Sequence, residues 1–312
     1  MRWQTKLFLD KVKDLIPAHE FLRRTKRVMF GFHPDRMRDI GAIQEGVKQI
    51  GWVGSAIELR SARLVEIGSG WQPVLPLLYS LAGTREFVMT DLKRLCHPQA
   101  LAATLNSLVL NRSHFFEQLA FPESALARLQ RPTAGEPMEE TLRRFSITYR
   151  APCDFRSTAY PDGSVDAVVS RAVLEHIPPE ILRGIFQEAK RILRPGGIMC
   201  HFVDNSDHFG HADTSIPLIH FLKYSNRAFS WLQSGSLYQN RLRHSQYSEM
   251  LQAAGFRIER EERIVDPKAL LALESSPVAP EFRGFSKEDL AAMDSCFLAV
   301  NPDVGAPKPA TG

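Results

Sequence analysis

Residues 66–70, Glu-Ile-Gly-Ser-Gly, place an acid and two glycines directly after a short apolar run. Because glycine has no Cβ, the backbone at Gly68 and Gly70 can adopt unusual dihedral angles and come close to a ligand. The residues that follow begin a helix, whose first N–H groups have no partner within the helix. This pattern is typical of a nucleotide-type cofactor site, and a plain tight turn is the alternative interpretation.

Asp91 closes a second short apolar run, residues 87–90, and lies 21 residues beyond Gly70. In open α/β sheets an acid at that separation, at the end of the second strand, can accept hydrogen bonds from ribose hydroxyls. The alternative is that Asp91 caps the helix that follows it.

The stretch 204–213, Asp-Asn-Ser-Asp-His-Phe-Gly-His-Ala-Asp, contains groups that could accept a proton. His208 is the first candidate for a general base because imidazole titrates near neutral pH, and Asp207 or Asp213 could orient it. His211 is the second candidate. The alternatives are a polar loop that caps helices and a metal site, but one short loop rarely supplies all the ligands of a metal, so we predict none.

Strand and helix patterns alternate along the chain and must position these groups. Apolar runs predict strands at residues 64–67, 87–90, 145–149, 165–170, 197–203, 256–260 and 295–300. Helical spacing predicts helices at residues 38–60, 74–81, 101–108, 180–193, 218–231, 248–254 and 287–293. This order favours an α/β fold with a doubly wound, mostly parallel seven-stranded sheet, in which ligands bind at the carboxyl ends of the strands.

The chain divides into three parts by composition. Residues 1–60 are expected to form a basic helical N-terminal extension, residues 61–300 the main domain, and residues 301–312, rich in proline and glycine, a disordered tail. Two insertions are expected in the domain, at about 114–143 and 204–243. The second is rich in histidine and aromatic residues, and its position makes it the expected substrate cover.

Composition sets further bounds. The 44% apolar and 24% charged residues are ordinary for a globular protein, and no apolar run is long enough to cross a bilayer. Since the N-terminus also lacks a secretory signal, we expect a cytoplasmic location. The four cysteines lie far apart without a C-x-x-C pair, which argues against a zinc knuckle or a disulfide framework and predicts free thiols.

Positive charge is concentrated near the N-terminus. Residues 1–40 contain ten Lys and Arg against five Asp and Glu, a net charge of +5, whereas the whole chain carries +4. Apolar residues recur at helical spacing within 6–16, so this segment predicts a basic amphipathic helix. Such a helix could make peripheral contact with an anionic membrane or with a phosphate-bearing substrate. Packing on the domain with a solvated outer face is the preferred interpretation.

Residues 60–300 also resemble the class I S-adenosylmethionine-dependent methyltransferases, most closely the small-molecule branch typified by the ubiquinone and menaquinone enzymes. Residues 66–70 match the first motif of that family, and Asp91 matches its ribose-binding acid. The later landmarks follow in order: Asp154-Phe155, Tyr-Pro-Asp-Gly-Ser-Val-Asp at 160–166, Val-Leu-Glu-His-Ile at 173–177, and Arg-Ile-Leu-Arg-Pro-Gly-Gly at 191–197.

The resemblance implies a Rossmann-like methyltransferase fold and S-adenosylmethionine as the cofactor. It places Asp154 at the adenine amino group and makes His176 a structural residue near the cofactor. Trp71 and Gln72 depart from the family pattern because they replace the third small residue of the glycine loop. A dinucleotide is disfavoured because position 73 is proline, so G-x-G-x-x-G is absent. The expected cofactor-binding residues are Glu66, Gly68, Ser69, Gly70, Asp91, Asp154, Phe155 and Ser170, the last because it lies at the tip of the fourth strand.

These observations predict an enzyme that transfers a methyl group to an oxygen or carbon of a small-molecule acceptor. A nucleic-acid partner is disfavoured, since the sequence has no recognisable RNA-binding module and no Asn/Asp-Pro-Pro-aromatic motif after the fourth strand. Two alternatives remain open: an RNA or protein methyltransferase that docks through the basic N-terminus, and a catalytically inactive cofactor-binding scaffold.

Overall fold

The computed structural model describes residues 1–14, 36–114, 136–233 and 238–302, together with four single positions, Phe121, Ala125, Arg128 and Leu129. Most of the predicted insertion at 114–143 lies outside the described residues, as does the predicted tail beyond residue 302.

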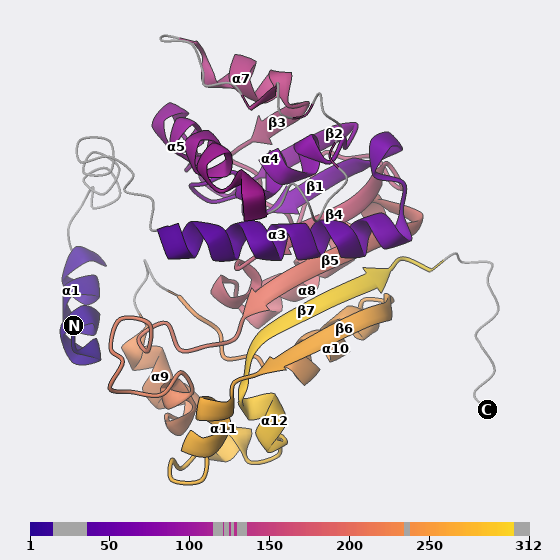
Figure 1. Cartoon of the computed structure of the whole chain (residues 1–312). Helices are drawn as coiled ribbons and strands as arrows, with labels where there is room; N and C mark the ends of the chain where they lie inside the picture. Colours follow the sequence, from indigo (N-terminus) through magenta and orange to yellow (C-terminus); the bar gives the residue numbers. More distant parts are fainter. Residues whose placement is uncertain are drawn as a thin grey trace.

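A seven-stranded sheet forms the centre of the molecule (Figure 1), with the order β3-β2-β1-β4-β5-β7-β6. The first five of these strands pair in parallel, whereas β7 runs antiparallel to both β5 and β6. The prediction of a mostly parallel seven-stranded sheet is confirmed, and the one antiparallel strand makes the sheet mixed. The strands are β1 (Arg63–Ile67), β2 (Glu86–Thr90), β3 (Ile147–Arg150), β4 (Val165–Arg171), β5 (Leu193–Asp204), β6 (Arg257–Val265) and β7 (Ala292–Val300).

The central strands are buried on both faces, which explains why their sequences read as continuous apolar runs. In β1, Leu64 packs into the core on one face of the sheet, while Val65 and Ile67 pack into the core on the other. Helices on each side supply the rest of these two cores. The central strands therefore have continuous apolar sequences because each strand contributes side chains to two separate apolar cores.

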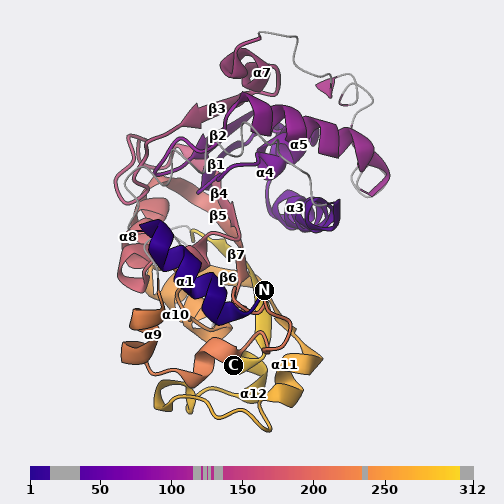
Figure 2. The ribbon, with the colours of Figure 1, turned by 90° about the vertical axis from the view of Figure 1, so that its left-hand side faces the viewer.

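Helices cover both faces of the sheet (Figure 2). Four helices flank one face: α3 (Arg36–Ala56), α4 (Val74–Leu81), α5 (Pro98–Leu110) and α7 (Met138–Arg144). Two helices, α8 (Pro179–Ile192) and α10 (His244–Ala253), cover the other face. The polar groups of interest lie at the carboxyl ends of β1, β2, β4 and β5.

A third apolar cluster lies at the end of the molecule beyond β6 and β7 (Figure 1). It joins Phe221 and Phe282 to residues of α9 (Asn226–Leu232), α11 (Pro267–Ala272) and α12 (Lys287–Leu290). Part of this cluster comes from the segment predicted to be the substrate cover. Residues 218–232 therefore pack against residues 269–293 and share one apolar core with them.

Two predicted helices are wrong in extent. The helix predicted at 218–231 is a short 3-10 turn, His220–Lys223, followed by α9, because Ser225 caps α9 by accepting a hydrogen bond from the N–H of Ala228 at 3.2 Å. The helix predicted at 287–293 ends at Leu290, and β7 begins at Ala292. Apolar spacing alone does not reveal either boundary, since β7 is also apolar.

The N-terminal helix α1 (Trp3–Asp14) packs on the loop that follows β5. The Trp3 ring lies 5.1 Å from the His220 ring, and the Trp3 N–H donates to Asp213 Oδ2 at 2.8 Å. Lys6 Nζ donates to the carbonyl of His208 at 3.0 Å, so the basic helix holds this loop directly. None of the described helices is both long and apolar enough to span a membrane.

Candidate active site

The glycine loop begins where β1 ends. Gly68 and Gly70 have φ angles of +68° and +63°, in the left-handed region that favours glycine. A Cβ added to Gly68 would lie 2.6 Å from Cγ1 of Val173, whereas a Cβ added to Gly70 would meet no atom within 4 Å. Gly68 is therefore required for close packing against the turn after β4. Gly70 instead faces open space at the carboxyl ends of the strands.

Asp91, at the end of β2, holds this loop in place. The N–H of Gly70 donates to Asp91 Oδ2 at 2.9 Å, and the N–H of Lys93 donates to Oδ1 at 3.2 Å. Partial burial raises the pKa of the Asp91 carboxyl, and these backbone donors oppose the rise. The structure thus brings together two residues that the sequence predicts to bind the cofactor. Contact of Asp91 with a ribose stays a prediction.

Glu66 and Ser69 face into the protein at the base of the loop. The Ser69 hydroxyl donates to Glu66 Oε2 at 2.5 Å, and the Thr90 hydroxyl donates to the carbonyl of Glu66 at 2.6 Å. Burial raises the pKa of Glu66 to about 8, although the bond from Ser69 lowers it. The visible contacts of these side chains stabilise the loop and link β1 to β2.

The loop after β3 lies beside Asp91, since the N–H of Cys153 donates to the Asp91 carbonyl at 2.8 Å. Asp154 is exposed and pairs with Arg156, whose Nη2 lies 2.6 Å from Oδ2 and whose hydrogen bonds lower the pKa of the Asp154 carboxyl. The Phe155 side chain is buried in the core with Val65. Asp154 therefore reaches solvent next to the glycine loop, while Phe155 anchors the loop that carries it.

Ser170 lies near the end of β4, and its contact with the cofactor stays a prediction. Its side chain is fully buried, and its hydroxyl forms a 2.7 Å hydrogen bond with Nδ1 of His201 on β5. Its carbonyl accepts a 2.9 Å hydrogen bond from Gln49 of α3. The next residue, Arg171, is partly exposed and donates to Glu45 Oε2 at 2.5 Å.

Three histidines gather beyond β4 and β5. The ring centroids of His176 and His208 are 5.0 Å apart, and those of His208 and His211 are 5.8 Å apart. Asp204, the last residue of β5, lies between the two histidines of the loop: its Oδ2 is 3.3 Å from His208 Nε2 and 3.6 Å from His211 Nε2. His208 and His211, the first and second candidates for a general base, thus contact the same carboxylate oxygen, and their catalytic role stays a prediction.

The charges of this group favour an ionised Asp204. Burial pushes the pKa of Asp204 upward, but hydrogen bonds and charge from His208 and His211 outweigh burial and hold the pKa well below its usual range. The same contact raises the pKa of His211. Asp204 is therefore a stable anion that can support a positive charge on an adjacent imidazole.

The predicted partners of His208 are wrong. Asp207 is buried, and its carboxylate lies 3.4 Å from His220 Nδ1 and accepts the N–H of Phe209. Asp213 accepts the N–H of Trp3. The loop turns at Asp207, so both of these carboxylates are used to fold it, while Asp204 extends from the end of β5 toward His208.

Glu175 is the residue of this region that the sequence analysis missed. Its side chain is 2% exposed, and neither carboxylate oxygen has a hydrogen-bond partner among the described residues. Burial raises the pKa of Glu175 well above its usual range. His176 Nε2 lies 4.0 Å from its Oε1. The signal was the Leu-Glu-His sequence itself, which was interpreted as structural.

Val173 connects the two halves of this region. It is the residue that a side chain on Gly68 would strike, and it precedes Glu175 by two positions. The glycine loop and the histidine group therefore lie next to each other. Such an arrangement can hold a nucleotide-like cofactor on one side and place a base beside a reacting atom on the other.

A methyltransferase-domain family model matches residues 123–201, a segment that includes α7, β3, β4, α8 and most of β5. The Leu-Glu-His turn and the loop of Asp154 both lie within this segment. The glycine loop lies ahead of it, and its open face at Gly70 and the acid at Asp91 suit a nucleoside cofactor. The enzyme is an S-adenosylmethionine-dependent methyltransferase. Its cofactor is S-adenosylmethionine, and its Rossmann-like sheet is that of class I.

Solved structures similar to this methyltransferase are distant in sequence. An S-adenosylmethionine-dependent methyltransferase from Mesorhizobium loti is 15% identical, with 82% of this chain and 99% of that chain covered and a TM-score of 0.44. A Listeria monocytogenes enzyme described as a putative S-adenosylmethionine-dependent methyltransferase is 12% identical, with 83% and 99% covered and a TM-score of 0.45.

A third structure, the putative methyltransferase in complex with the Haloferax volcanii Trm112 activator, is 18% identical, with 85% and 94% covered and a TM-score of 0.44. No curated protein matches the sequence.

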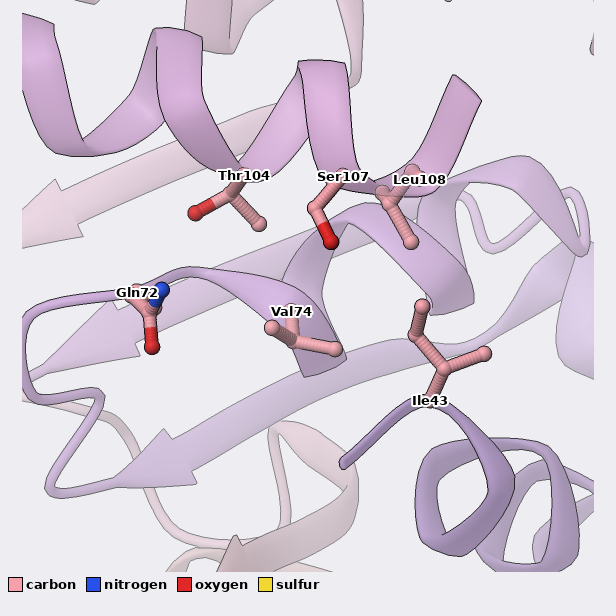
Figure 3. A pocket seen from close by; sticks show the side chains of 6 residues that line it. All are labelled: Ile43, Gln72, Val74, Thr104, Ser107 and Leu108. Carbon is pink, nitrogen blue, oxygen red and sulfur yellow. The ribbon is translucent and has the colours of Figure 1, made fainter. Parts of the chain in front are cut away.

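Gln72, which departs from the family pattern, lines a small pocket of the methyltransferase (Figure 3). The pocket lies between the start of α4, α3 and α5, where Gln72 and Val74 meet Ile43, Thr104 and Ser107. Its empty volume is about 190 Å³ including open solvent, and it has no room for even a water molecule, so it is too small to hold a small-molecule ligand. The neighbouring Trp71 ring packs edge-on against His97 at 6.1 Å, so this departure serves packing around the helices.

A larger cleft of the methyltransferase opens beside α9, with an empty volume of about 890 Å³ including its open mouth. Phe229, Phe282 and the guanidinium of Arg241 line it, and this guanidinium lies 4.3 Å and 4.8 Å from the two ring centroids. Tyr238 also lines the cleft, and its carbonyl accepts a 2.8 Å hydrogen bond from His176 Nδ1. The cleft and the histidine group thus share a wall.

Proposed function

We propose that this methyltransferase methylates a hydroxyl oxygen of a small-molecule acceptor. The single observation that carries the proposal is the pairing of His208 and His211 with Asp204 beside the glycine loop. A carbon acceptor is the second candidate, because an activated carbon also gives up a proton when it is methylated.

The cofactor, when bound, supplies a methyl group on a sulfonium, and the protein has to hold the acceptor in line with it. A hydroxyl also has to lose its proton as the new bond forms. An imidazole held by Asp204 is suited to take that proton, because the carboxylate stabilises the resulting imidazolium. His211 is 54% exposed at its side chain, so it can pass the proton to solvent.

The cleft beside α9 supports an acceptor with both apolar and polar parts. Its walls combine the rings of Phe229, Phe282 and Phe285 with the amides of Gln239 and Asn240. Eight of the fourteen residues that line the cleft are polar or charged, so an acceptor that carries several polar groups would suit it. The motif resemblance to the ubiquinone and menaquinone enzymes points in the same direction.

Methyl label from the cofactor tests the acceptor class. The purified enzyme would be incubated with labelled S-adenosylmethionine and with separate pools of small metabolites, RNA and protein. We expect label in the metabolite pool, in a product that no longer forms when the acceptor hydroxyl is acetylated beforehand. Label that appears only in RNA or only in protein would contradict the proposal in favour of those alternatives. Cofactor binding without label in any pool would favour the inactive scaffold.

A further inference from the structure

We propose that Glu175, His176 and His208 bind one divalent transition-metal ion, of the kind represented by Zn²⁺ and Mn²⁺. The binding site itself is argued from the three side chains. The role we give the ion, which is to hold the oxygen of the acceptor, rests on the proposed function.

The three residues converge from two separate parts of the chain. Glu175 and His176 belong to the 3-10 turn Leu174–His176 after β4, and His208 belongs to the loop after β5. One ligand atom from each residue lies within 4.8 Å of the other two. Ligand atoms at about 2.0–2.2 Å from a zinc ion are separated by at most roughly 4 Å, so small side-chain rotations would complete the coordination.

Glu175 supplies the independent evidence that something binds here. Its carboxylate is buried, and both oxygens lack a hydrogen-bond partner among the residues that the structure describes. Burial of an unpaired carboxylate is costly, and buried charges are normally paired or coordinate metals. A cation between Glu175 and the two histidines would satisfy these oxygens.

His176 is already oriented from outside the triad. His176 Nδ1 is bonded to the Tyr238 carbonyl, which leaves Nε2 on the side of Glu175. Asp204 Oδ2 lies 3.3 Å from His208 Nε2, which forms no hydrogen bond among the described residues and so is free to bind an ion. Metal-binding histidines commonly have a carbonyl or carboxylate partner on their other nitrogen, where it fixes the direction of the ring.

The donor set indicates the kind of ion. Two imidazoles and one carboxylate suit zinc, manganese or iron, whereas magnesium and calcium favour oxygen ligands. Three protein ligands leave coordination positions open, and an acceptor oxygen could fill one of them. His211, which contacts the same Asp204 oxygen as His208, remains available to take the acceptor proton.

Metal titration of the full-length protein, first stripped with chelator, tests the site. We expect one Zn²⁺ or Mn²⁺ per chain by calorimetry and elemental analysis, no competition by millimolar Mg²⁺, and a higher melting temperature with Zn²⁺. Glu175→Gln keeps the shape of the side chain but removes its charge. Since loss of an outer-shell partner already costs roughly 10–100-fold in metal affinity, this loss of a ligand should cost at least about 100-fold.

The matched control is Glu262→Gln. Glu262 is a partly exposed glutamate on β6 that pairs with Lys48 at 2.8 Å, outside the histidine group, and its loss should leave metal affinity unchanged. His176→Asn is the second test variant and should weaken binding as Glu175→Gln does. Circular dichroism of the metal-free variants verifies that they are folded.

Two results would overturn the site: no stoichiometric binding of either ion to the wild-type protein, or wild-type affinity in folded Glu175→Gln and His176→Asn. The role of the ion is tested separately from the proposed function. Full methylation of a hydroxyl acceptor by chelated, metal-free enzyme would remove the role of the ion and leave the proposed function intact. Stoichiometric binding that Glu175→Gln abolishes, without methylation of any hydroxyl, would support the site and contradict the proposed function.

Discussion

The backbone N–H of Gly70 donates a 2.9 Å hydrogen bond to Oδ2 of Asp91, which ties the turn after β1 to the end of β2. Two residues that are separated by 21 positions therefore act as one unit. Any ligand that approaches the open side of Gly70 also meets the carboxylate that fixes the shape of the loop.

Substitution of Asp91 is expected to reduce cofactor affinity. Asp91→Asn removes the charge that accepts hydrogen bonds from Gly70 and, as we predict, from the ribose. Hydrogen bonds to charged groups contribute about 1.5–3 kcal/mol, so the dissociation constant of S-adenosylmethionine should rise roughly 10- to 100-fold in calorimetry. Asp162→Asn is the control, since Asp162 is exposed and pairs with Arg191 on the surface. Equal affinities of the two variants would remove Asp91 from the cofactor site.

Substitution of the two loop glycines should have different effects on stability and on cofactor binding. Gly68→Ala forces a methyl group against Val173, so we expect a loss of about 1–3 kcal/mol in the free energy of unfolding, measured with urea. Gly70→Ala meets no atom within 4 Å and should cost only the roughly 1–2 kcal/mol of a left-handed backbone, yet weaken cofactor binding.

A double variant separates packing from backbone strain at position 68. Val173→Ala removes the atoms that the new methyl group would strike, so it should restore part of the stability lost in Gly68→Ala. Additive destabilisation by the two substitutions would show that Val173 is not the obstacle.

Asp204 should control turnover rather than cofactor binding. Asp204→Asn removes the anion that supports His208 and His211, and general base catalysis is typically worth about 10²–10⁴-fold. We therefore expect kcat to fall by at least about 100-fold, with little change in the dissociation constant of S-adenosylmethionine. Asp213→Asn should change kcat much less, because Asp213 contacts Trp3 instead. A larger loss of kcat in Asp213→Asn than in Asp204→Asn would instead favour Asp213, one of the partners of His208 predicted from the sequence.

Stability should depend on pH through Glu66. Burial raises its pKa from 4.5 to about 8, so between these values the folded protein binds a proton that the unfolded chain has released. Stability from this group is complete below about pH 4.5 and is lost as the pH rises toward 8, by an amount on the order of a few kcal/mol. Glu66→Gln should flatten this slope when melting temperatures are compared at pH 5 and pH 8. Parallel profiles would show that Glu66 titrates normally.

Peripheral membrane contact remains a prediction from the basic N-terminus. It can be tested by substitution of exposed side chains on α1. Phe8 of α1 and Trp231 of α9 are 66% and 73% exposed, and Lys11 Nζ donates to the Trp231 carbonyl at 2.5 Å. Apolar side chains beside lysines suit the interface of an anionic bilayer. We expect sedimentation with phosphatidylglycerol vesicles that weakens with salt and in Phe8→Asp. Equal sedimentation of Phe8→Asp would exclude this surface.

Most of the sheet could be predicted because its buried strands are marked by short apolar runs between turn residues. The strand β6 is mostly charged and exposed, and only its first part was predicted, at 256–260. Helix ends were harder, as at 218–231, because the spacing of apolar side chains continues across the break at Ser225. The sequence also could not distinguish α12 from the start of β7, since local patterns do not show which apolar residues enter the sheet.

The cofactor half of the site was easier to predict than the acceptor half. Gly70 and Asp91 follow directly from strand ends, so the parallel order of β1 and β2 brings them together. The partner of His208 depends on how a loop folds, and the loop uses Asp207 for its own turn. Glu175 was missed because burial, which makes its unpaired carboxylate unusual, is a property of the packed structure.

The antiparallel strand β7 also determines the order in which the molecule can be completed. It lies between β5 and β6, yet it is made after both of them during synthesis. Until residue 292 has emerged from the ribosome, the adjacent edges of β5 and β6 have no partner and are open to pairing with other chains. A nascent chain that stalls shortly before β7 should therefore aggregate or recruit chaperones, although most of the cofactor loop would already be folded.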